Sequence, residues 1–102
     1  MIRGTTPTLT FNTDVDLTGA DRLYITFQQN GKTVLEKSLE DMTVTPTTIT
    51  LTLTQADTLA FENSRNAPEV LIQIRAGWLA GDAIASDIMY TTVNRLLKDG
   101  VI

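Results

Sequence analysis

The stretch Thr48-Ile49-Thr50-Leu51-Thr52-Leu53-Thr54 alternates threonine and aliphatic residues without a break. Successive side chains of a strand point to opposite faces, so the aliphatic side chains share one face and the threonines share the other. Threonine is β-branched and suits a pleated surface, and 18 of the 102 residues are threonine. The pattern predicts a half-buried strand here, and the composition favours more strands along the chain.

Further strands are predicted on both sides of this stretch by the same period of two. Clear alternation marks residues 8–11, 23–29, 70–78 and 84–93, weaker alternation marks 33–39, and a short edge strand is expected at 42–44. A turn is expected at Thr45-Pro46-Thr47, where the apolar alternation changes face. One helical turn is expected near Gln55–Leu59, because Thr54 and Asp57 have the spacing of a capping box.

About seven short strands separated by turn signals are typical of an antiparallel two-sheet β-sandwich, the Ig-like arrangement. We therefore predict an all-β fold with one short helical turn, and a small closed barrel is the alternative. A length of 102 residues suits one domain, and no linker or repeat divides the chain. Residues 1–102 are expected to form a single β-sandwich domain.

The first hairpin is expected to turn at Gly31, as the last residue of a three-residue loop and in a left-handed conformation. This loop places Ile25 opposite Leu35, so that apolar residues meet across the strands. A two-residue turn would instead place Ile25 opposite Glu36, and the hydrophobic pattern therefore favours the longer loop.

The second hairpin is expected to repeat this arrangement at Gly81. Its three-residue loop sets Ala76 opposite Ile84 and, further along the same strands, Ile72 opposite Ile88. The inward-facing residues of all these strands form the predicted core. They are Leu9, Phe11, Leu23, Ile25, Phe27, Leu35, Ile49, Leu51, Leu53, Phe61, Ile72, Ile74, Ile84 and Ile88.

Several classes of function are disfavoured by composition. The chain has neither cysteine nor histidine, which removes thiol chemistry, the commonest general base and the commonest metal ligand. A net charge of −4 argues against binding dominated by nucleic-acid phosphate. No apolar run approaches the roughly 20 residues of a membrane span. No serine stands in a G-x-S-x-G motif, so we expect a chain that is not an enzyme and carries no cofactor.

One acidic segment resembles the start of a calcium loop, because Asn12, Asp14 and Asp16 have the 1-3-5 spacing. The sixth and twelfth positions are leucines where an EF-hand needs Gly and Glu, which rejects that type of loop. A looser site formed with Asp21 at one end of the sandwich is the alternative. The simpler interpretation is a solvated turn whose carboxylates cap the local backbone.

The strand predicted at 84–93 is apolar on both faces, which one sheet of a sandwich does not need. Its second face and the C-terminal segment therefore suggest a partner surface. The residues are Ala85, Met89, Val93, Leu96, Leu97, Val101 and Ile102. Either the C-terminal segment folds back over its own sheet, or it docks on another subunit, and a homo-oligomer is the favoured expectation.

Four segments resemble small prophage-encoded structural proteins of Gram-positive bacteria. They are Ile2-Arg3-Gly4-Thr5-Thr6-Pro7-Thr8, the run from Leu53 to Phe61 that is similar to "LTQEDTLxF", the run from Gly81 to Ile88 that is similar to "GDALASDI", and the ending from Val93 to Ile102. The family is distantly similar to the N-terminal domain of phage baseplate upper proteins. The resemblance implies a non-enzymatic structural or assembly role in a tail or baseplate, with other phage structural proteins as partners. It also implies the bacterial cytoplasm during assembly, or the virion, as location.

A second hypothesis is an Ig-like binding module that recognises carbohydrate or protein through its loops. An exposed aromatic platform would favour this hypothesis over the assembly role, whereas a bound divalent ion at Asp14 and Asp16 would favour metal-dependent activity.

Overall fold

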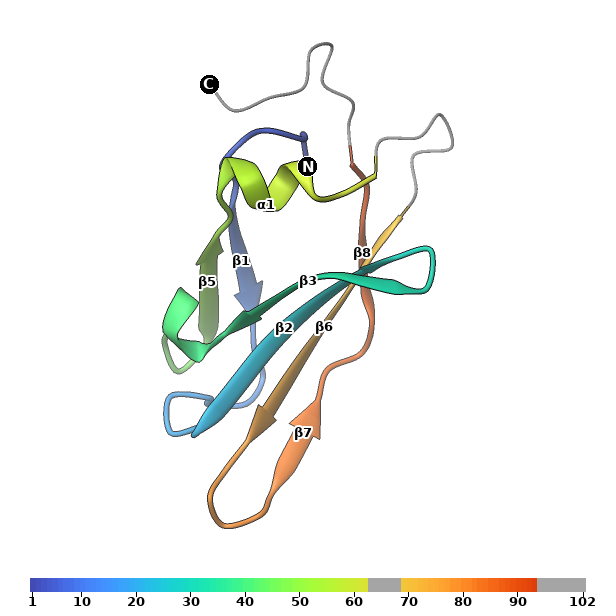
Figure 1. The fold of residues 1–102 in the computed structure, drawn as a ribbon. Coiled ribbons are helices and arrows are strands. Elements are labelled where there is room, and N and C mark those ends of the chain that lie inside the picture. The colour runs from blue at the N-terminus through green and yellow to red at the C-terminus, as the bar shows by residue number, and fades with distance from the viewer. Residues whose placement is uncertain (63–68, 94–102) are drawn as a thin grey trace.

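The computed structural model describes residues 1–62 and 69–93, and in this part of the chain two antiparallel β-sheets form the fold (Figure 1). The elements are β1 (Thr8–Asn12), β2 (Arg22–Gln29), β3 (Lys32–Ser38), the 3-10 helix η1 (Leu39–Asp41), β4 (Met42–Val44), β5 (Thr48–Thr52), α1 (Gln55–Leu59), β6 (Val70–Gly77), β7 (Ala83–Ala85) and β8 (Met89–Thr91). The predicted all-β sandwich is confirmed, and so are the predicted bounds of α1 and β4.

The smaller sheet has the strand order β1-β5-β4, and the larger has the order β3-β2-β6 with β7 and β8 following one another along the outer edge of β6. In β5 the predicted alternation is confirmed, because Ile49 and Leu51 are buried and the threonines are half-buried or exposed. β5 ends at Thr52, but Leu53 continues into the core. The hydrophobic core lies between the inner faces of the two sheets.

Most of the predicted core is confirmed. Leu23, Ile25, Phe27, Ile49, Leu51, Leu53, Phe61, Ile72 and Ile74 are buried, and Leu9, Phe11 and Leu35 are partly buried against them. Two predictions were wrong, since Ile84 is 43% exposed and Ile88 is 50% exposed. Buried residues that the prediction missed include Leu17, Ala20, Val70, Ala76 and Val93.

The register predicted for the first hairpin was wrong. Asn30 and Gly31 both have positive φ, at 52° and 75°, which makes a two-residue turn whose twist suits the flanking strands. Ile25 pairs with Lys37 rather than with Leu35 or Glu36. A bulge between Phe27 and Gln28 adds one residue to β3, so Phe27 pairs with Leu35 and the apolar residues still share a face. The positive φ predicted for Gly31 is confirmed.

The second hairpin has the predicted three-residue loop. Gly81 has a φ of 101° and donates its N–H to the carbonyl of Trp78 at 3.0 Å, while Trp78 donates to Asp82 at 3.0 Å. Ala76 pairs with Ile84 as predicted. Beyond β7 the prediction was wrong, because Ile72 pairs with Met89 and not with Ile88.

The register changes because the outer strand is interrupted at Ser86-Asp87-Ile88. Ser86 donates its own N–H to the carbonyl of Ile74 at 2.8 Å, and its hydroxyl accepts the N–H of Ile74 at 3.0 Å. A side chain thus replaces a backbone carbonyl in the ladder, and one extra residue enters the strand. As a result the inward face passes from even-numbered Ile84 to odd-numbered Met89, which explains why the sequence is apolar on both faces.

Candidate functional site

An open groove lies between the two sheets on the side where β1 and β7 form their edges. Its volume is about 420 Å³. Ile74 and Ala76 of β6 contribute from the inner face of the larger sheet. Phe11 of β1 lines the groove from the smaller sheet, and Ile84 of β7 lines it from the larger. Its lining is mainly apolar, with polar groups at the rim.

The groove exists because the two sheets differ in width. The smaller sheet stops at β1, whereas the larger continues beyond β6 to β7 and β8. Ile84 stands opposite buried Ala76 and so belongs to the inner face, yet 43% of it is exposed. Within the described residues, no strand of the smaller sheet stands over β7. The smaller sheet is one strand short of covering the larger one.

Among the residues that the structure describes, no strand pairs with the outer edge of β1, and nothing in β1 protects this edge against strand pairing. Backbone hydrogen bonds from Thr13 to Thr47 and from Leu53 to Pro7 place the odd-numbered residues of β1 toward β5. The N–H and C=O groups of Thr8, Thr10 and Asn12 therefore point away from β5. Natural edge strands are commonly blocked by charged residues or proline, and β1 contains neither.

The other edges of the two sheets differ from that of β1. The exposed edge strand β3 carries Lys32, Glu36 and Lys37. The edge strands β4, β7 and β8 are each only three residues long. Short or charged edges discourage the addition of another strand. Of the edges in the described part of the chain, that of β1 is the best suited to receive one.

Two carboxylates, Asp14 and Asp87, lie among the residues that line the groove. They give it an acidic rim around apolar walls, to which Val15 at 48% exposure and Met89 also contribute. This combination suits an apolar segment that carries basic residues beside its apolar ones.

The three carboxylates considered for a metal site have separate surroundings. Asp16 accepts hydrogen bonds from the hydroxyl and the N–H of Thr18, at 2.6 and 2.9 Å, and these bonds lower the pKa of Asp16. Asp21 accepts the N–H of Leu79 at 2.6 Å. Asp14 lines the groove. Among residues 1–62 and 69–93, no cluster of three or more carboxylates is placed to hold a metal ion.

The residues predicted as a partner surface fall into three groups. Ala85 is exposed and Met89 is half-buried, and both line the groove. Val93 is only 3% exposed and belongs to the core of its own chain. Leu96, Leu97, Val101 and Ile102 lie outside the described residues. The sequence thus indicated one wall of the groove, but not the contribution of β1, because strand order is set by tertiary structure.

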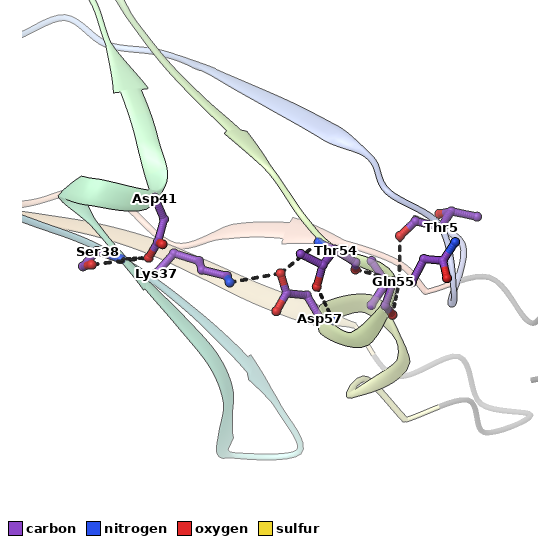
Figure 2. Close-up of polar contacts among 8 residues, drawn as sticks. Thr5, Lys37, Ser38, Asp41, Thr54, Gln55 and Asp57 are labelled. Atoms are coloured by element: carbon purple, nitrogen blue, oxygen red, sulfur yellow. Dashed lines mark hydrogen bonds and ion pairs between the residues drawn. The ribbon is translucent and has the colours of Figure 1, made fainter. Parts of the chain in front are cut away.

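A polar cluster joins the larger sheet to α1 (Figure 2). The Lys37 ammonium lies 3.0 Å from an Asp57 carboxylate oxygen, and the two side chains are only 19% and 13% exposed. Asp57 also accepts the N–H of Thr54, and the Thr54 hydroxyl accepts the N–H of Asp57, which is the predicted capping box. Lys37 and Ser38 have different partners, since the Ser38 hydroxyl donates to Asp41. These contacts are structural, because each charged group is satisfied by the fold.

Asp57 is expected to make stability depend on acidity. Burial raises the pKa of this carboxyl, but hydrogen bonds from Thr54 and Lys37 outweigh burial and hold the pKa below 3.8. A lowered pKa stabilises the folded chain above the ordinary carboxyl range, and this stabilisation is lost as pH falls through the folded-state pKa. Asp57→Asn should therefore cost about 1 kcal/mol at pH 7 and less at pH 3.

Urea unfolding at pH 7, 5, 4 and 3 measures this difference. Lys37→Gln serves as the companion variant, because it removes the cation and leaves the capping box intact. It should reduce the same pH dependence partially. Equal losses for Asp57→Asn at pH 7 and pH 3 would contradict the assignment.

Arg3 ties the N-terminal segment to the end of α1. Its guanidinium donates to the carbonyl oxygens of Phe61 and Leu59, at 2.7 and 2.8 Å. Thr58, which is fully buried, donates its hydroxyl to the carbonyl of Thr5 at 2.8 Å. Two of the segments that carry the family resemblance therefore contact each other, and these contacts maintain the fold.

Replacing Arg3 with Met is expected to lower the free energy of unfolding by about 2–3 kcal/mol, because two carbonyls lose charge-assisted donors. The cationic head also stabilises the C-terminal end of α1. Chemical denaturation of wild type and variant measures the loss. The control is Lys32→Met at the exposed start of β3, which should change stability by less than about 0.5 kcal/mol. A similar small change for Arg3→Met would contradict the role given to Arg3.

A second, smaller groove of about 320 Å³ lies on the outer face of the larger sheet, where Thr26 and Ile88 contribute to its lining. The Thr26 hydroxyl is buried there without a hydrogen-bond partner among the described residues. Tyr90 is 65% exposed and stands opposite Leu71, which lines this groove. The arrangement offers an aromatic ring beside polar side chains on a sheet face.

No helix in the described ranges has the length and apolar content needed to cross a bilayer. Comparison of the chain with family models, with curated proteins and with solved structures returned no match.

Proposed function

We propose that this chain is a non-enzymatic structural or assembly protein of a phage or prophage particle, associated with the tail or baseplate. The groove between β1 and β7 carries the proposal. It leaves inner-face residues such as Ile84 uncovered and lies beside an unprotected strand edge. An apolar recess with an open strand edge suits contact with another protein subunit. The resemblance to prophage structural proteins supplies the phage context.

The contact is a protein–protein contact because the groove combines two features that a polypeptide satisfies together. Its apolar walls take side chains, and the backbone groups of Thr8, Thr10 and Asn12 take a peptide backbone. The cytoplasm during assembly and the finished particle are the two places where such partners would be met.

The test measures whether the chain is present in purified phage particles. A strain carrying the gene is induced, particles are purified by density gradient, and the chain is quantified in them by mass spectrometry. Ile84→Asp should lower its incorporation at least tenfold, because the variant places a carboxylate in an acidic, apolar groove. Leu79→Asp is the matched control, since Leu79 is 89% exposed at a hairpin tip outside the groove. Equal incorporation of the two variants, or absence of the wild-type chain from particles, contradicts the proposal.

A binding module for carbohydrate is the second candidate, and exposed Tyr90 favours it. The ring lies on a sheet face rather than on a loop, next to the groove that contains the unpartnered Thr26 hydroxyl. Isothermal titration with cell-wall polysaccharide of the host strain tests this candidate. Tyr90→Ala should abolish binding, whereas Ile84→Asp should leave it unchanged.

A further inference from the structure

We infer that the groove between β1 and β7 receives residues 94–102 of a second copy of this chain, added as an extended strand beside β1. The inference rests on the proposed function, which makes this groove a site of protein contact. It identifies the occupant as this chain's own C-terminal segment and makes the assembly unit a homo-oligomer.

The shape of the site requires an extended segment. The free backbone groups of β1 repeat at every second residue, which only another strand can match along its length. A strand in this position would become the fourth of the smaller sheet and would stand over β7 and β8. Side chains on its inner face would contact Phe11, Ile84 and Met89, which line the groove. It would complete the layer that the smaller sheet leaves unfinished.

The composition of residues 94–102 suits this site. The segment contains the apolar residues Leu96, Leu97, Val101 and Ile102 and two basic residues, Arg95 and Lys98. The basic residues complement the acidic rim made by Asp14 and Asp87. Nine extended residues span about 30 Å, which exceeds the roughly 17 Å length of five-residue β1. The segment is therefore long enough to follow the whole edge.

The direction of β8 favours a second copy as the donor. Met89 lines the groove, and the chain continues through β8 to Val93, which is buried in the core four residues beyond Met89. The chain therefore moves away from the groove before residue 94. To fill its own groove, the chain would have to reverse direction after Val93 and cross the roughly 10 Å between the sheets. This path would use up some of the residues that are needed to line β1. A second copy has no such constraint, and reciprocal exchange of segments gives a closed dimer.

The first experiment measures the mass of the full-length chain by light scattering from about 1 µM to about 0.1 mM. Wild type should be a dimer at the upper concentration. Ile84→Asp alters the groove and Leu97→Asp alters the segment, and each should weaken self-association at least tenfold. Leu79→Asp, the exposed control outside the groove, should behave as wild type.

The second experiment mixes the two defective variants. Ile84→Asp retains an intact segment and Leu97→Asp retains an intact groove, so the mixture has one complete pair of contacts. Sedimentation with one variant fluorescently labelled should show a heterodimer at a concentration where each variant alone is monomeric. A mixture that remains monomeric overturns the inference.

Other outcomes also overturn it. A monomeric wild type whose melting temperature falls in Leu97→Asp shows that the segment folds back on its own chain. A monomeric wild type without that fall shows that the segment does not occupy the groove. A dimer that persists in both variants shows an interface elsewhere. In each of these cases the particle experiment can still show that Ile84→Asp is incorporated less than Leu79→Asp. That result would mean that the groove binds a different protein, so the proposed function would hold although residues 94–102 do not occupy the groove.

Discussion

Replacing Phe61 with Ala is expected to lower the free energy of unfolding by about 3–5 kcal/mol. Phe61 is 1% exposed, and its ring packs edge-to-face on that of Phe27, with centroids 5.9 Å apart and an interplanar angle of 66°. The residue lies two positions after the last residue of α1, and its carbonyl accepts a hydrogen bond from Arg3. Removal of the ring leaves a cavity where the end of α1 meets the core.

Urea unfolding followed by circular dichroism measures this loss. Domains of this size have a total stability of about 5–15 kcal/mol, so the loss expected for the Ala variant is a large part of the total. Phe61→Leu is the second variant, because it keeps most of the apolar volume and should lose less than half as much. A loss below about 1 kcal/mol for Phe61→Ala would show that the aromatic pair does not anchor the core.

Ile74→Ala is expected to cost about 2–5 kcal/mol, whereas Ile84→Ala should cost less than about 1 kcal/mol. The two isoleucines lie on neighbouring strands and face the same way, but Ile74 is 7% exposed and Ile84 is 43% exposed. The smaller sheet covers the first and ends before the second. The difference between the two losses of unfolding free energy therefore shows how far the smaller sheet covers the larger one.

The comparison is made by denaturation at about 1 µM, where association through the groove is weakest. Ile84→Ala serves as the control for Ile74→Ala, because the same atoms are removed from the same face. Equal losses would mean that Ile84 is covered in solution, in conflict with an open groove.

Local alternation was enough to predict most of the fold. The run of threonines and aliphatic residues became β5, and the spacing of Thr54 and Asp57 became the capping box of α1. Such features depend on residues close together in sequence, and burial on one face enforces them. The loop at Gly81 was predictable for the same reason.

The two wrong register predictions share a physical cause, which is an extra residue in one strand of a pair. In β3, Val34 is the extra residue, because Leu35 pairs with Phe27 and Thr33 pairs with Gln28. This bulge keeps Leu35 opposite Phe27, which a two-residue turn without a bulge would not do. At Ser86 a hydroxyl took the place of a backbone carbonyl, so the inward face moved from Ile84 to Met89. Alternation assumes one residue for each step of the ladder, and a side chain that bonds to the neighbouring backbone changes that count.

The candidate site was predictable only in part. The apolar residues on both faces of the last strand indicated an uncovered surface, and two of them, Ala85 and Met89, do line the groove. The opposite wall comes from β1, which is distant in sequence. In the described part of the chain β1 pairs with β5 alone, and β4 takes the other edge of β5, so the outer edge of β1 stays open. That arrangement arises from the packing of the sheets, so no local pattern marks it.

The pairing of distant strands affects how this protein is made on the ribosome. Thr10 pairs with Thr50, 40 residues further along the chain, and Ile25 pairs with Ile74. At synthesis rates of about 5–20 residues per second, β1 emerges about 2–8 s before its partner. During those seconds Leu9 and Phe11 lack the strand β5 that pairs with β1, whereas the hairpin of β2 and β3 can form almost at once. The apolar side chains of β1 therefore stay uncovered on the nascent chain until β5 has been made, and the β2–β3 hairpin stays incompletely covered until β6 follows.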